Sequence, residues 1–203
     1  MEIQALQVGS IPTNCYLVFD PGRTDALVID PGDNPERIFA ALNGRTPAAV
    51  LLTHGHFDHT GALSAFAGVP IYIHEADAPM LSDPHLSVGD GNGDLRPRPA
   101  ATHLLADGEQ LHLAGLDIAV LHTPGHTPGS YCFLCGDLFI TGDTLFAGSI
   151  GRTDLEGGSY PEMEKSLARL LSLPVPDQAQ VLPGHGEFST FGREKKTNGF
   201  LQF

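Results

Sequence analysis

Four side chains that commonly bind metal ions lie within one six-residue stretch, from His54 to His59. The stretch follows a run of apolar residues that is typical of a buried strand. In an extended chain, side chains two positions apart project to the same side, so His54 and His56 can reach one ion. Asp58 and His59 lie where the chain should turn into a helix, so they face elsewhere and could hold a second ion. Gly55, between the two histidines, leaves room for the backbone to pass close to a metal.

Three more candidate ligands follow strand-like segments further along the chain. They are His126 in a turn rich in proline and glycine, Asp143 in a Gly-Asp-Thr turn, and His185 in a Pro-Gly-His-Gly turn. A ligand set of imidazoles and carboxylates without thiolate suits zinc, although iron or manganese fits the same ligands. The five other histidines have no matching role and are expected in packing or at the surface: His74, His85, His103, His112 and His122.

The charge balance and the cysteines limit the classes of function. Among 203 residues, 24 acidic side chains stand against 11 basic ones, a formal net charge of −13 that argues against nucleic-acid and anionic-membrane partners. No secretory signal is expected at the start, and no apolar run approaches the ~20 residues that span a bilayer. Three cysteines give no disulfide framework, which fits a cytoplasmic protein. Cys132 and Cys135 should pack on opposite faces of one strand.

Short apolar runs between turn residues predict a chain built mainly of strands. Helices are expected at Glu36–Leu42, Thr60–Ala67 and Tyr160–Leu173, the last with a Ser-x-x-Glu capping box. Residues 82–101 are rich in Gly, Pro and Asp without periodicity, and a loop of this length is a candidate substrate lid. Two packed sheets with helices outside them are expected, as a single domain of residues 1–203. The expected strands are 1–8, 15–19, 26–29, 48–53, 71–74, 110–113, 117–121, 131–134, 138–141 and 180–182.

The His-x-His-x-Asp-His motif together with the three downstream ligands resembles the metallo-β-lactamase superfamily. The resemblance covers essentially the whole chain and implies a mixed α/β (α+β) fold, the αββα four-layer sandwich with a two-metal site at one edge. It also places an aspartate at Asp30 to support the histidine loop, although Asp30 could instead cap the turn at Pro31-Gly32. Asp58 and Asp143 would take part in catalysis as well as in metal binding. The implied arrangement is His54, His56 and His126 on one ion, Asp58, His59 and His185 on the second, and Asp143 as the bridge.

The resemblance also points to a reaction. Two divalent ions about 3.5–4 Å apart can lower the pKa of a bound water toward ~7 and hold a bridging hydroxide against a carbonyl. A thiol of pKa ~8.5 leaves without a strong general acid, which favours a thioester or an activated ester. The segment Thr144–Asp154 looks most like the short glyoxalase II-like hydrolases, which implies S-lactoylglutathione or a related thioester as substrate. Arg152 would take the place of a lysine that holds glutathione in full-length glyoxalase II, and Asp154 stands roughly where that enzyme has a tyrosine.

Two features of the chain bear on the expected substrate. Full-length glyoxalase II continues, beyond the position of His185, into a helical domain with cationic glutathione contacts, and no such domain is expected in these 203 residues. The basic tail Gly192–Asn198 could replace those contacts or be a solvated end. Two bound divalent ions would make the field at the site positive despite the acidic chain, so a small anionic thioester is the expected partner. The sequence does not predict an oligomeric state.

Other readings of the same ligands lead to different reactions. The main alternative is a persulfide dioxygenase on the same fold, with a mononuclear iron held by His54, His126 and Asp143. A non-catalytic metal-binding module is the second alternative. Secreted β-lactamases usually carry a cysteine where Asp143 stands, which disfavours that branch. Metal analysis separates the first two readings, because two zinc-like ions per chain support the hydrolase and one iron supports the dioxygenase.

Overall fold

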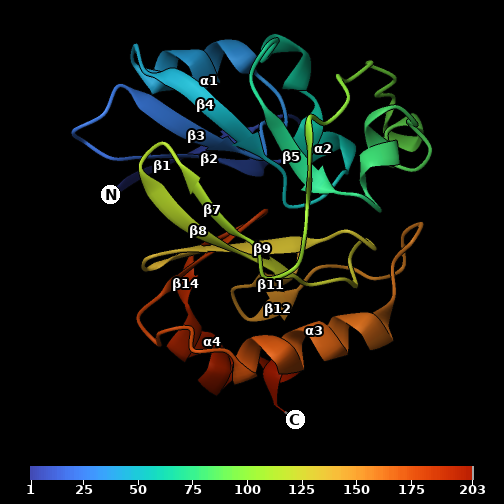
Figure 1. Cartoon of the computed structure of the whole chain (residues 1–203). Helices are drawn as coiled ribbons and strands as arrows, with labels where there is room; N and C mark the ends of the chain where they lie inside the picture. Colours follow the sequence, from blue (N-terminus) through green and yellow to red (C-terminus); the bar gives the residue numbers. More distant parts are fainter. Residues whose placement is uncertain (203) are drawn as a thin grey trace.

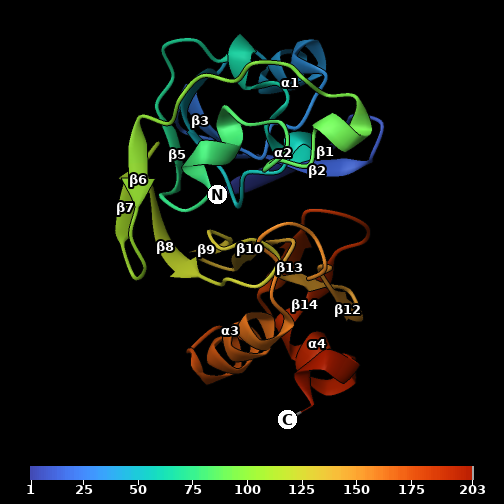
Figure 2. The same cartoon turned by 90° about the vertical axis from the view of Figure 1, so that its right-hand side faces the viewer.

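The computed structural model of the chain describes residues 1–202 and contains two β-sheets packed face to face between two helical layers (Figures 1 and 2). In Figure 1, α1 (Pro35–Leu42) and α2 (Phe57–Thr60) accompany the first sheet, and α3 (Tyr160–Ser172) and α4 (Phe191–Thr197) cover the second. The αββα four-layer sandwich implied by the sequence is confirmed. Phe203, the last residue of the expected single domain, lies outside the described residues.

The first sheet is built from the N-terminal half of the chain in the order β1-β2-β3-β4-β5-β6. β1, β2 and β3 pair antiparallel, whereas β3 to β6 run parallel. The carboxyl ends of parallel strands meet at one edge of a sheet, so the turns that follow β3 and β4 lie side by side there. The strands are β1 (Glu2–Val8), β2 (Thr13–Phe19), β3 (Asp25–Ile29), β4 (Thr46–Leu51), β5 (Ile71–His74) and β6 (His103–Leu105).

The second sheet is built from the C-terminal half in the order β14-β13-β10-β9-β8-β7. β10 and β13 run parallel, and the other pairs are antiparallel. A separate hairpin, β11 (Leu145–Phe146) and β12 (Ser149–Ile150), follows β10. The sheet strands are β7 (Gln110–Leu113), β8 (Leu116–His122), β9 (Tyr131–Cys135), β10 (Leu138–Gly142), β13 (Gln180–Pro183) and β14 (Ser189–Thr190).

Three apolar clusters hold the layers together. The first fills the space between the sheets, where Tyr16 and Leu51 are buried with Phe133 and Ile140. The second lies between the first sheet and α1, which contributes Ile38, and the third lies between the second sheet and α3 and α4. Burying a large apolar side chain contributes about 1.5–3 kcal/mol, so these clusters are the main reason why the sheet edges are held in a fixed position.

The cysteines pack as the strand period predicts. Cys132 and Cys135 lie on β9 and belong to different clusters, one on each face of the sheet. Both are buried and unpaired, as is Cys15. None of the helices in residues 1–202 is both long and apolar enough to cross a bilayer.

The helix expected at Thr60–Ala67 is wrong. The chain instead forms the short helix α2, which ends at Thr60, and a separate 3₁₀ turn at Leu63–Ala65. The N–H of Ala62 donates to the carbonyl oxygen of Pro31 at 2.9 Å rather than to the preceding helical turn. This tertiary hydrogen bond interrupts the helix, and no periodicity in the sequence announces it.

The helix expected near the C-terminal end of the chain is confirmed. α3 begins after Ser159, whose Oγ accepts a hydrogen bond from the N–H of Glu162 at 3.4 Å. The strands expected from the sequence are present with shifts of one or two residues at their ends. Among the strands and α-helices, β6, the β11–β12 hairpin, β14 and α4 were not expected. They are short, and α4 covers most of the basic tail.

Candidate metal centre

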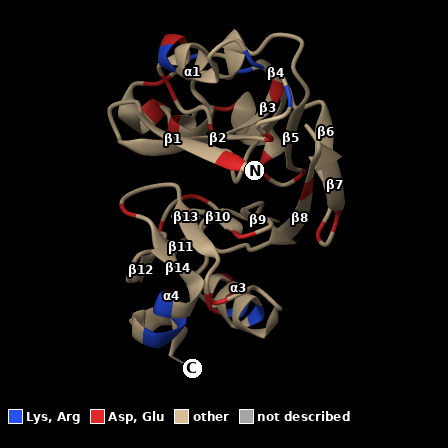
Figure 3. Ribbon diagram, turned by 90° about the vertical axis from the view of Figure 1, so that its left-hand side faces the viewer, with Lys and Arg blue, Asp and Glu red and all other residues tan. Residues whose placement is uncertain are grey.

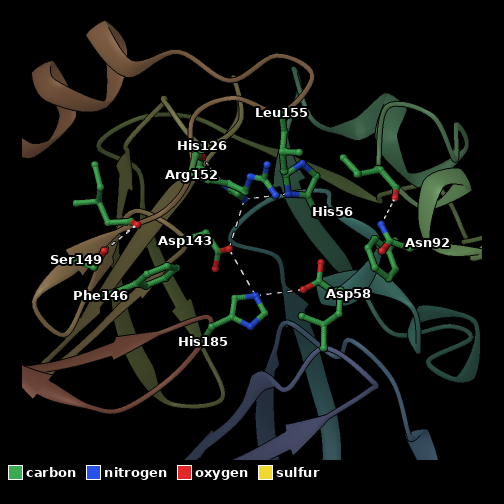
Figure 4. A pocket seen from close by; sticks show the side chains of 14 residues that line it. His56, Asp58, Asn92, His126, Asp143, Phe146, Ser149, Arg152, Leu155 and His185 are labelled. Carbon is green, nitrogen blue, oxygen red and sulfur yellow. Dashed lines mark hydrogen bonds and ion pairs between the residues drawn. The ribbon is translucent and has the colours of Figure 1, made fainter.

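All seven candidate ligands lie at the edge of the sandwich where the turns after β4, β8, β10 and β13 meet. Figure 4 shows several of them around one cavity, with Asp143 between His126 and His185. The two sheets are also joined at this edge by a β-bridge between Thr13 and His185 and by the Asn14 N–H, which donates to the Gly184 carbonyl at 2.7 Å. The fold therefore brings together residues that are up to 131 positions apart in the sequence, from His54 to His185.

Three histidines form the first ligand group, His54, His56 and His126. Their candidate ligand atoms all lie within 4.8 Å of one another, and all three side chains are buried. Nδ1 of His56 lies 2.9 Å from Nε2 of His126, and the His54 ring centroid lies 4.7 Å from that of His56. Three imidazoles converging in this way form a typical zinc or iron ligand set.

Asp58, His59 and His185 form the second ligand group, with ligand atoms again within 4.8 Å. Nε2 of His185 lies 3.2 Å from Oδ2 of Asp58 and 3.4 Å from Nε2 of His59. Asp58 and His59 are the two residues that the sequence analysis expected on a second ion. His185 joins them from the other sheet.

Asp143 lies between the two groups. Its Oδ2 is 3.4 Å from Nε2 of His126 and 3.6 Å from Nε2 of His185, and its Oδ1 is 3.5 Å from Nε2 of His59. Oδ1 of Asp143 and Nε2 of His54 are buried without a hydrogen-bond partner among the described residues. Such orphaned polar atoms are costly, and a cation in each ligand group would satisfy them. The residues therefore fit a metal site.

The remaining nitrogen of each of two histidines is fixed by a backbone carbonyl group. Nδ1 of His126 donates to the Arg152 carbonyl oxygen at 2.7 Å, and Nδ1 of His185 donates to the Pro12 carbonyl oxygen at 3.1 Å. Carbonyl oxygens only accept hydrogen bonds, so Nδ1 carries the proton in both rings. In the neutral form of each ring, the lone pair is therefore on Nε2, which faces the site and is the nitrogen available to a metal.

Asp30 supports two of these side chains from behind. Its Oδ2 accepts hydrogen bonds from Nδ1 of His59 at 2.9 Å and from Oγ1 of Thr53 at 2.6 Å, and its Oδ1 accepts from the Thr53 N–H at 2.8 Å. The Thr53 hydroxyl oxygen lies 3.1 Å from Nδ1 of His54. The Asp30 carboxylate is buried and contacts the histidine loop, and its backbone takes a positive φ of 50° before Pro31.

The structure adds one acidic residue that was not singled out from the sequence. Asp77 is fully buried and accepts hydrogen bonds from the N–H groups of Gly55 and Gly129 and from the Thr127 hydroxyl, at 3.1, 2.7 and 2.7 Å. It therefore ties the His54–His56 loop to the turn that contains His126. A sequence signal existed, because Asp77 follows a buried strand, as the other site aspartates do.

The protonation of the first ligand group favours metal binding. Burial, reinforced by the neighbouring histidines, holds the pKa of His54 well below its ordinary value. Burial and the nearby His126 lower the pKa of His56 to about 3. Both rings are therefore neutral at physiological pH, with a lone pair available.

The second ligand group has the opposite electrostatics. Burial would lower the pKa of His59, but the carboxylates of Asp58, Asp30 and Asp143 outweigh it and raise that pKa to about 10. Burial would raise the pKa of Asp58, but His59 and His185 outweigh it and hold that pKa below its ordinary range. This concentration of negative charge is compensated by a cation, which is a proton on His59 in the absence of a metal ion.

A cavity of about 480 Å³ opens above the ligands. Its base is formed by His56, Asp58, His126, Asp143 and His185. The rest of the lining is largely apolar and includes Ile11, Phe57, Val88, Phe146, Ile150 and Leu155. A volume of this order is typical of small-molecule sites.

Arg152 lies at the rim of this cavity, and its guanidinium is paired with Asp154. The two side chains make hydrogen bonds of 2.7 and 2.9 Å in a bidentate arrangement and are 61% and 69% exposed. Arg152 is thus a cation beside the cavity, but one shared with a neighbouring carboxylate.

The loop at residues 82–101 forms part of the cavity wall through Val88 and Asn92. It is bound to α2 by Arg98, which donates to the Phe57 carbonyl at 3.1 Å and to the Thr60 hydroxyl at 2.8 Å.

The basic side chains of the tail do not line the cavity. They lie along α4 in the outer helical layer (Figure 3).

An αββα sandwich with histidines and aspartates gathered at one sheet edge defines a class of metal-dependent hydrolases. The family model described as the metallo-beta-lactamase superfamily matches residues 8–185. The chain belongs to the metallo-beta-lactamase superfamily.

Relatives align with the chain from end to end. An uncharacterized protein of Mycobacterium leprae is 41% identical over 217 residues, covering 100% of this chain and 99% of its own. The probable metallo-hydrolase YqgX of Bacillus subtilis is 36% identical, covering 99% of this chain and 98% of its own. The hydroxyacylglutathione hydrolase GloC of Haemophilus influenzae is 35% identical, also covering 99% and 98%.

Solved structures share the fold over almost the whole chain. The B3 metallo-beta-lactamase BLEG-1 superposes with a TM-score of 0.94 at 35% identity, covering 100% of both chains. The protein TTHA1623 in a di-iron-bound form gives a TM-score of 0.86 at 38% identity, covering 98% of this chain and 100% of its own. ETHE1 from Myxococcus xanthus gives 0.78 at 27% identity, covering 98% and 84%.

Proposed function

We propose that this metal-dependent hydrolase cleaves a small anionic thioester such as S-lactoylglutathione. The observation that carries the proposal is the convergence of two complete ligand groups on Asp143 at the base of an apolar-walled cavity. The likeness to the hydroxyacylglutathione hydrolase GloC over the full chain supports the same reaction class.

His54, His56 and His126 would hold one divalent ion, Asp58, His59 and His185 a second, and Asp143 would contact both. Zinc suits this ligand set, and iron or manganese fits it as well. When bound, two such ions would acidify a water molecule and polarise the carbonyl of an ester. The chain's own contribution is to fix these side chains through Asp30, Thr13 and the carbonyl groups behind the histidines.

The cavity's side chains favour a thiolate over an amine as the leaving group. Among the described residues that line it, every imidazole and carboxylate is a candidate metal ligand, and the other polar side chains are Asn92, Ser149 and Arg152. None of these three is a general acid near neutral pH. A thiol of pKa ~8.5 departs as the thiolate without such an acid. The Arg152 guanidinium offers an anionic substrate its one cationic contact in the cavity lining.

The test combines metal analysis with turnover. Protein purified from metal-supplemented culture is analysed for zinc, iron and manganese, and assayed with S-lactoylglutathione, with glutathione persulfide in an oxygen electrode, and with a chromogenic cephalosporin. We expect two metal ions per chain and turnover of the thioester. One iron per chain with oxygen uptake on persulfide would establish the dioxygenase alternative, and preferential cleavage of the cephalosporin would establish a lactamase.

The geometry argues against the alternatives retained from the sequence. A mononuclear iron site made of His54, His126 and Asp143 leaves Asp58, His59 and His185 gathered without a role. A non-catalytic metal module does not need a cavity above its ligands. The buried, unpaired cysteines fit a reducing compartment, so we place the enzyme in the cytoplasm.

A further inference from the structure

Two polar side chains of the C-terminal helix are fully buried, although they belong to neither ligand group. Glu194 lies within α4 and Asn198 caps its C-terminal end, and both are 0% exposed. They are four positions apart and so lie on one face of the helix. Arg193 and Lys196 of the same helix are exposed. The inward face of α4 is therefore built for a polar contact within the protein.

That contact is the back of the β11–β12 hairpin. Oε2 of Glu194 accepts a hydrogen bond from the Gly148 N–H at 2.7 Å. The side-chain amide of Asn198 donates to the carbonyl oxygens of Phe146 at 3.3 Å and Ser149 at 3.0 Å, and to Oε2 of Glu194 at 3.0 Å. Three backbone polar groups of one four-residue turn are thus satisfied by two side chains of α4.

The Glu194 carboxylate has no cationic partner among the described residues. Its other oxygen accepts a hydrogen bond from the Ser189 hydroxyl. A buried carboxylate is tolerated when several donors satisfy it, and here one of those donors is the turn of the hairpin. Because a hydrogen bond has a preferred geometry, the Glu194 carboxylate fixes the position of the hairpin turn more closely than an apolar side chain would.

The opposite side of the hairpin faces the cavity. Phe146, Ser149 and Ile150 line the cavity, and the Phe146 ring centroid lies 6.4 Å from that of His185. At the base of the hairpin, a Cβ on Gly151 would lie 1.8 Å from the carbonyl oxygen of Asp143, so this end is already closely packed. The turn at Ala147-Gly148 is the remaining free end, and α4 holds it.

We propose that Glu194 and Asn198 are positioning residues that set the substrate-binding wall of the cavity. By holding the hairpin turn from behind, they keep Phe146 and Ile150 against the apolar part of the bound substrate. Their loss should weaken substrate binding more than it slows the chemical step, because neither side chain touches the ligand groups. The effect on substrate rests on the proposed function, whereas the effect on the hairpin does not.

The test uses four variants of the full chain. Asn198→Ala removes the donor to the two hairpin carbonyls, and Glu194→Leu removes the acceptor for the Gly148 N–H. Glu194→Gln is the conservative variant, because its amide oxygen can still face the hairpin while the Ser189 hydroxyl turns to accept from its amide nitrogen. Lys196→Ala is the matched control on the exposed face of the same helix.

Hydrogen–deuterium exchange reads the hairpin directly, without any substrate. We expect hydrogen exchange in the peptide covering residues 145–150 to become about 10-fold faster in Asn198→Ala and Glu194→Leu. Each variant loses hydrogen bonds between the hairpin backbone and a buried side chain of α4. Glu194→Gln and Lys196→Ala should stay within about twofold of wild type. Peptides from β9 and β10 report whether the sheet itself is intact.

Steady-state kinetics on the thioester read the effect on the cavity wall. We expect KM to rise about 10-fold in the two disruptive variants while kcat changes less than about threefold, the pattern of lost substrate binding. A merely structural role would lower the folded fraction and the apparent kcat without moving KM. If Glu194→Leu does not fold, Asn198→Ala carries the test.

Unchanged exchange at residues 145–150 in folded Asn198→Ala protein would overturn the proposal, and so would a fall in kcat with unchanged KM. If the wild type turns over no thioester but the exchange results are as expected, the proposed function is wrong and the positioning of the hairpin stands.

Discussion

Two of the candidate ligands, His59 and His126, are each held from two directions, which helps to preorganise this edge of the fold. His59 lies between the Asp30 carboxylate on one side and the Asp143 carboxylate on the other, with contacts of 2.9 and 3.5 Å. His126 is held in the same way between the Arg152 carbonyl and Asp143. A metal ligand whose second nitrogen is bonded to the protein keeps its tautomer and its ring orientation.

Residue types and spacing were enough to single out the seven candidate ligands, because all of them lie in the segments that follow β4, β8, β10 and β13. The partners behind them were harder to predict. Asp77 follows a buried strand as the other site aspartates do, but its partners, like the carbonyl groups of Pro12 and Arg152, become visible only when segments distant in sequence are brought together. A backbone carbonyl leaves no mark in a sequence, since every residue has one.

Replacing Asp30 by asparagine should weaken binding at the second ligand group. All three groups that form hydrogen bonds with Asp30 are donors. The NH₂ group of an asparagine at this position would face one of these donors and could not accept its hydrogen bond. We expect the affinity for the second metal ion to fall by about 10- to 100-fold, measured by titration against a chromophoric chelator. Asp137→Asn, a substitution of an exposed aspartate, is the control. Equal affinities in both variants would contradict the supporting role.

The ion pair at the cavity rim should tune the affinity for an anionic substrate. Asp154 competes with the substrate for the Arg152 guanidinium, so Asp154→Asn should lower KM by about two- to fivefold, and Arg152→Gln should raise it. Both effects should shrink as salt is added, because the pair is exposed. Arg23→Gln is a matched control, since Arg23 forms the same bidentate pair with Asp25 far from the site. A KM that is insensitive to both rim variants would exclude Arg152 as a substrate contact.

At the scale of elements, the sequence predicts what is long and periodic. The buried strands and α3 are present as expected, because short apolar runs and a serine cap are local signals. The helix expected at Thr60–Ala67 failed because one N–H bonds to Pro31 across the chain. The β11–β12 hairpin and α4 were not expected, because both are short and depend on contacts between distant segments, such as those of Glu194 and Asn198, which no local pattern announces.

The loop at residues 82–101 should lose stability in acid. Burial would raise the pKa of Asp94, but hydrogen bonds from Arg96 and the charge of Arg98 outweigh it and lower that pKa to about 2. A carboxyl whose pKa is depressed on folding stabilises the protein above its unfolded pKa of about 3.9. That contribution is lost as the pH falls from about 4 toward about 2, when the folded protein takes up the proton.

The comparison of wild type with Asp94→Asn isolates this effect from the titration of other carboxylates. At pH 7, the variant should melt at a lower temperature, and exchange at residues 87–98 should be faster. The difference in Tm between the two proteins should disappear as the pH approaches 2. A difference in Tm that stays constant from pH 6 to pH 2 would show that the charge of Asp94 contributes nothing to the stability of the loop.

At the scale of the whole molecule, the candidate site joins two structural halves. The first sheet and its loops supply His54, His56, Asp58 and His59, and the second half supplies the other three ligands. Each ligand group contains residues from both halves. The chain has a net charge of −13, and the cluster of ligand carboxylates and imidazoles lies where the two halves meet. Cations bound there would both neutralise the carboxylates and link the sheets.

Removal of metal should therefore destabilise the whole fold and not only the site. A ligand that binds only the folded state at about 100 times its Kd adds about 2.7 kcal/mol, and for a domain of 150–250 residues about 1 kcal/mol shifts Tm by about 2–4 °C. We expect chelation to lower Tm by about 5–10 °C, with recovery when zinc is restored, measured by calorimetry alongside the metal content. His185→Ala, which removes a second-half ligand, should show a smaller response to zinc than wild type, while His112→Ala, at an exposed position, should respond fully. A Tm that is unchanged after both ions have been shown to leave would mean that contacts within the protein fix the two halves. The metal ions would then serve the chemistry without linking the sheets.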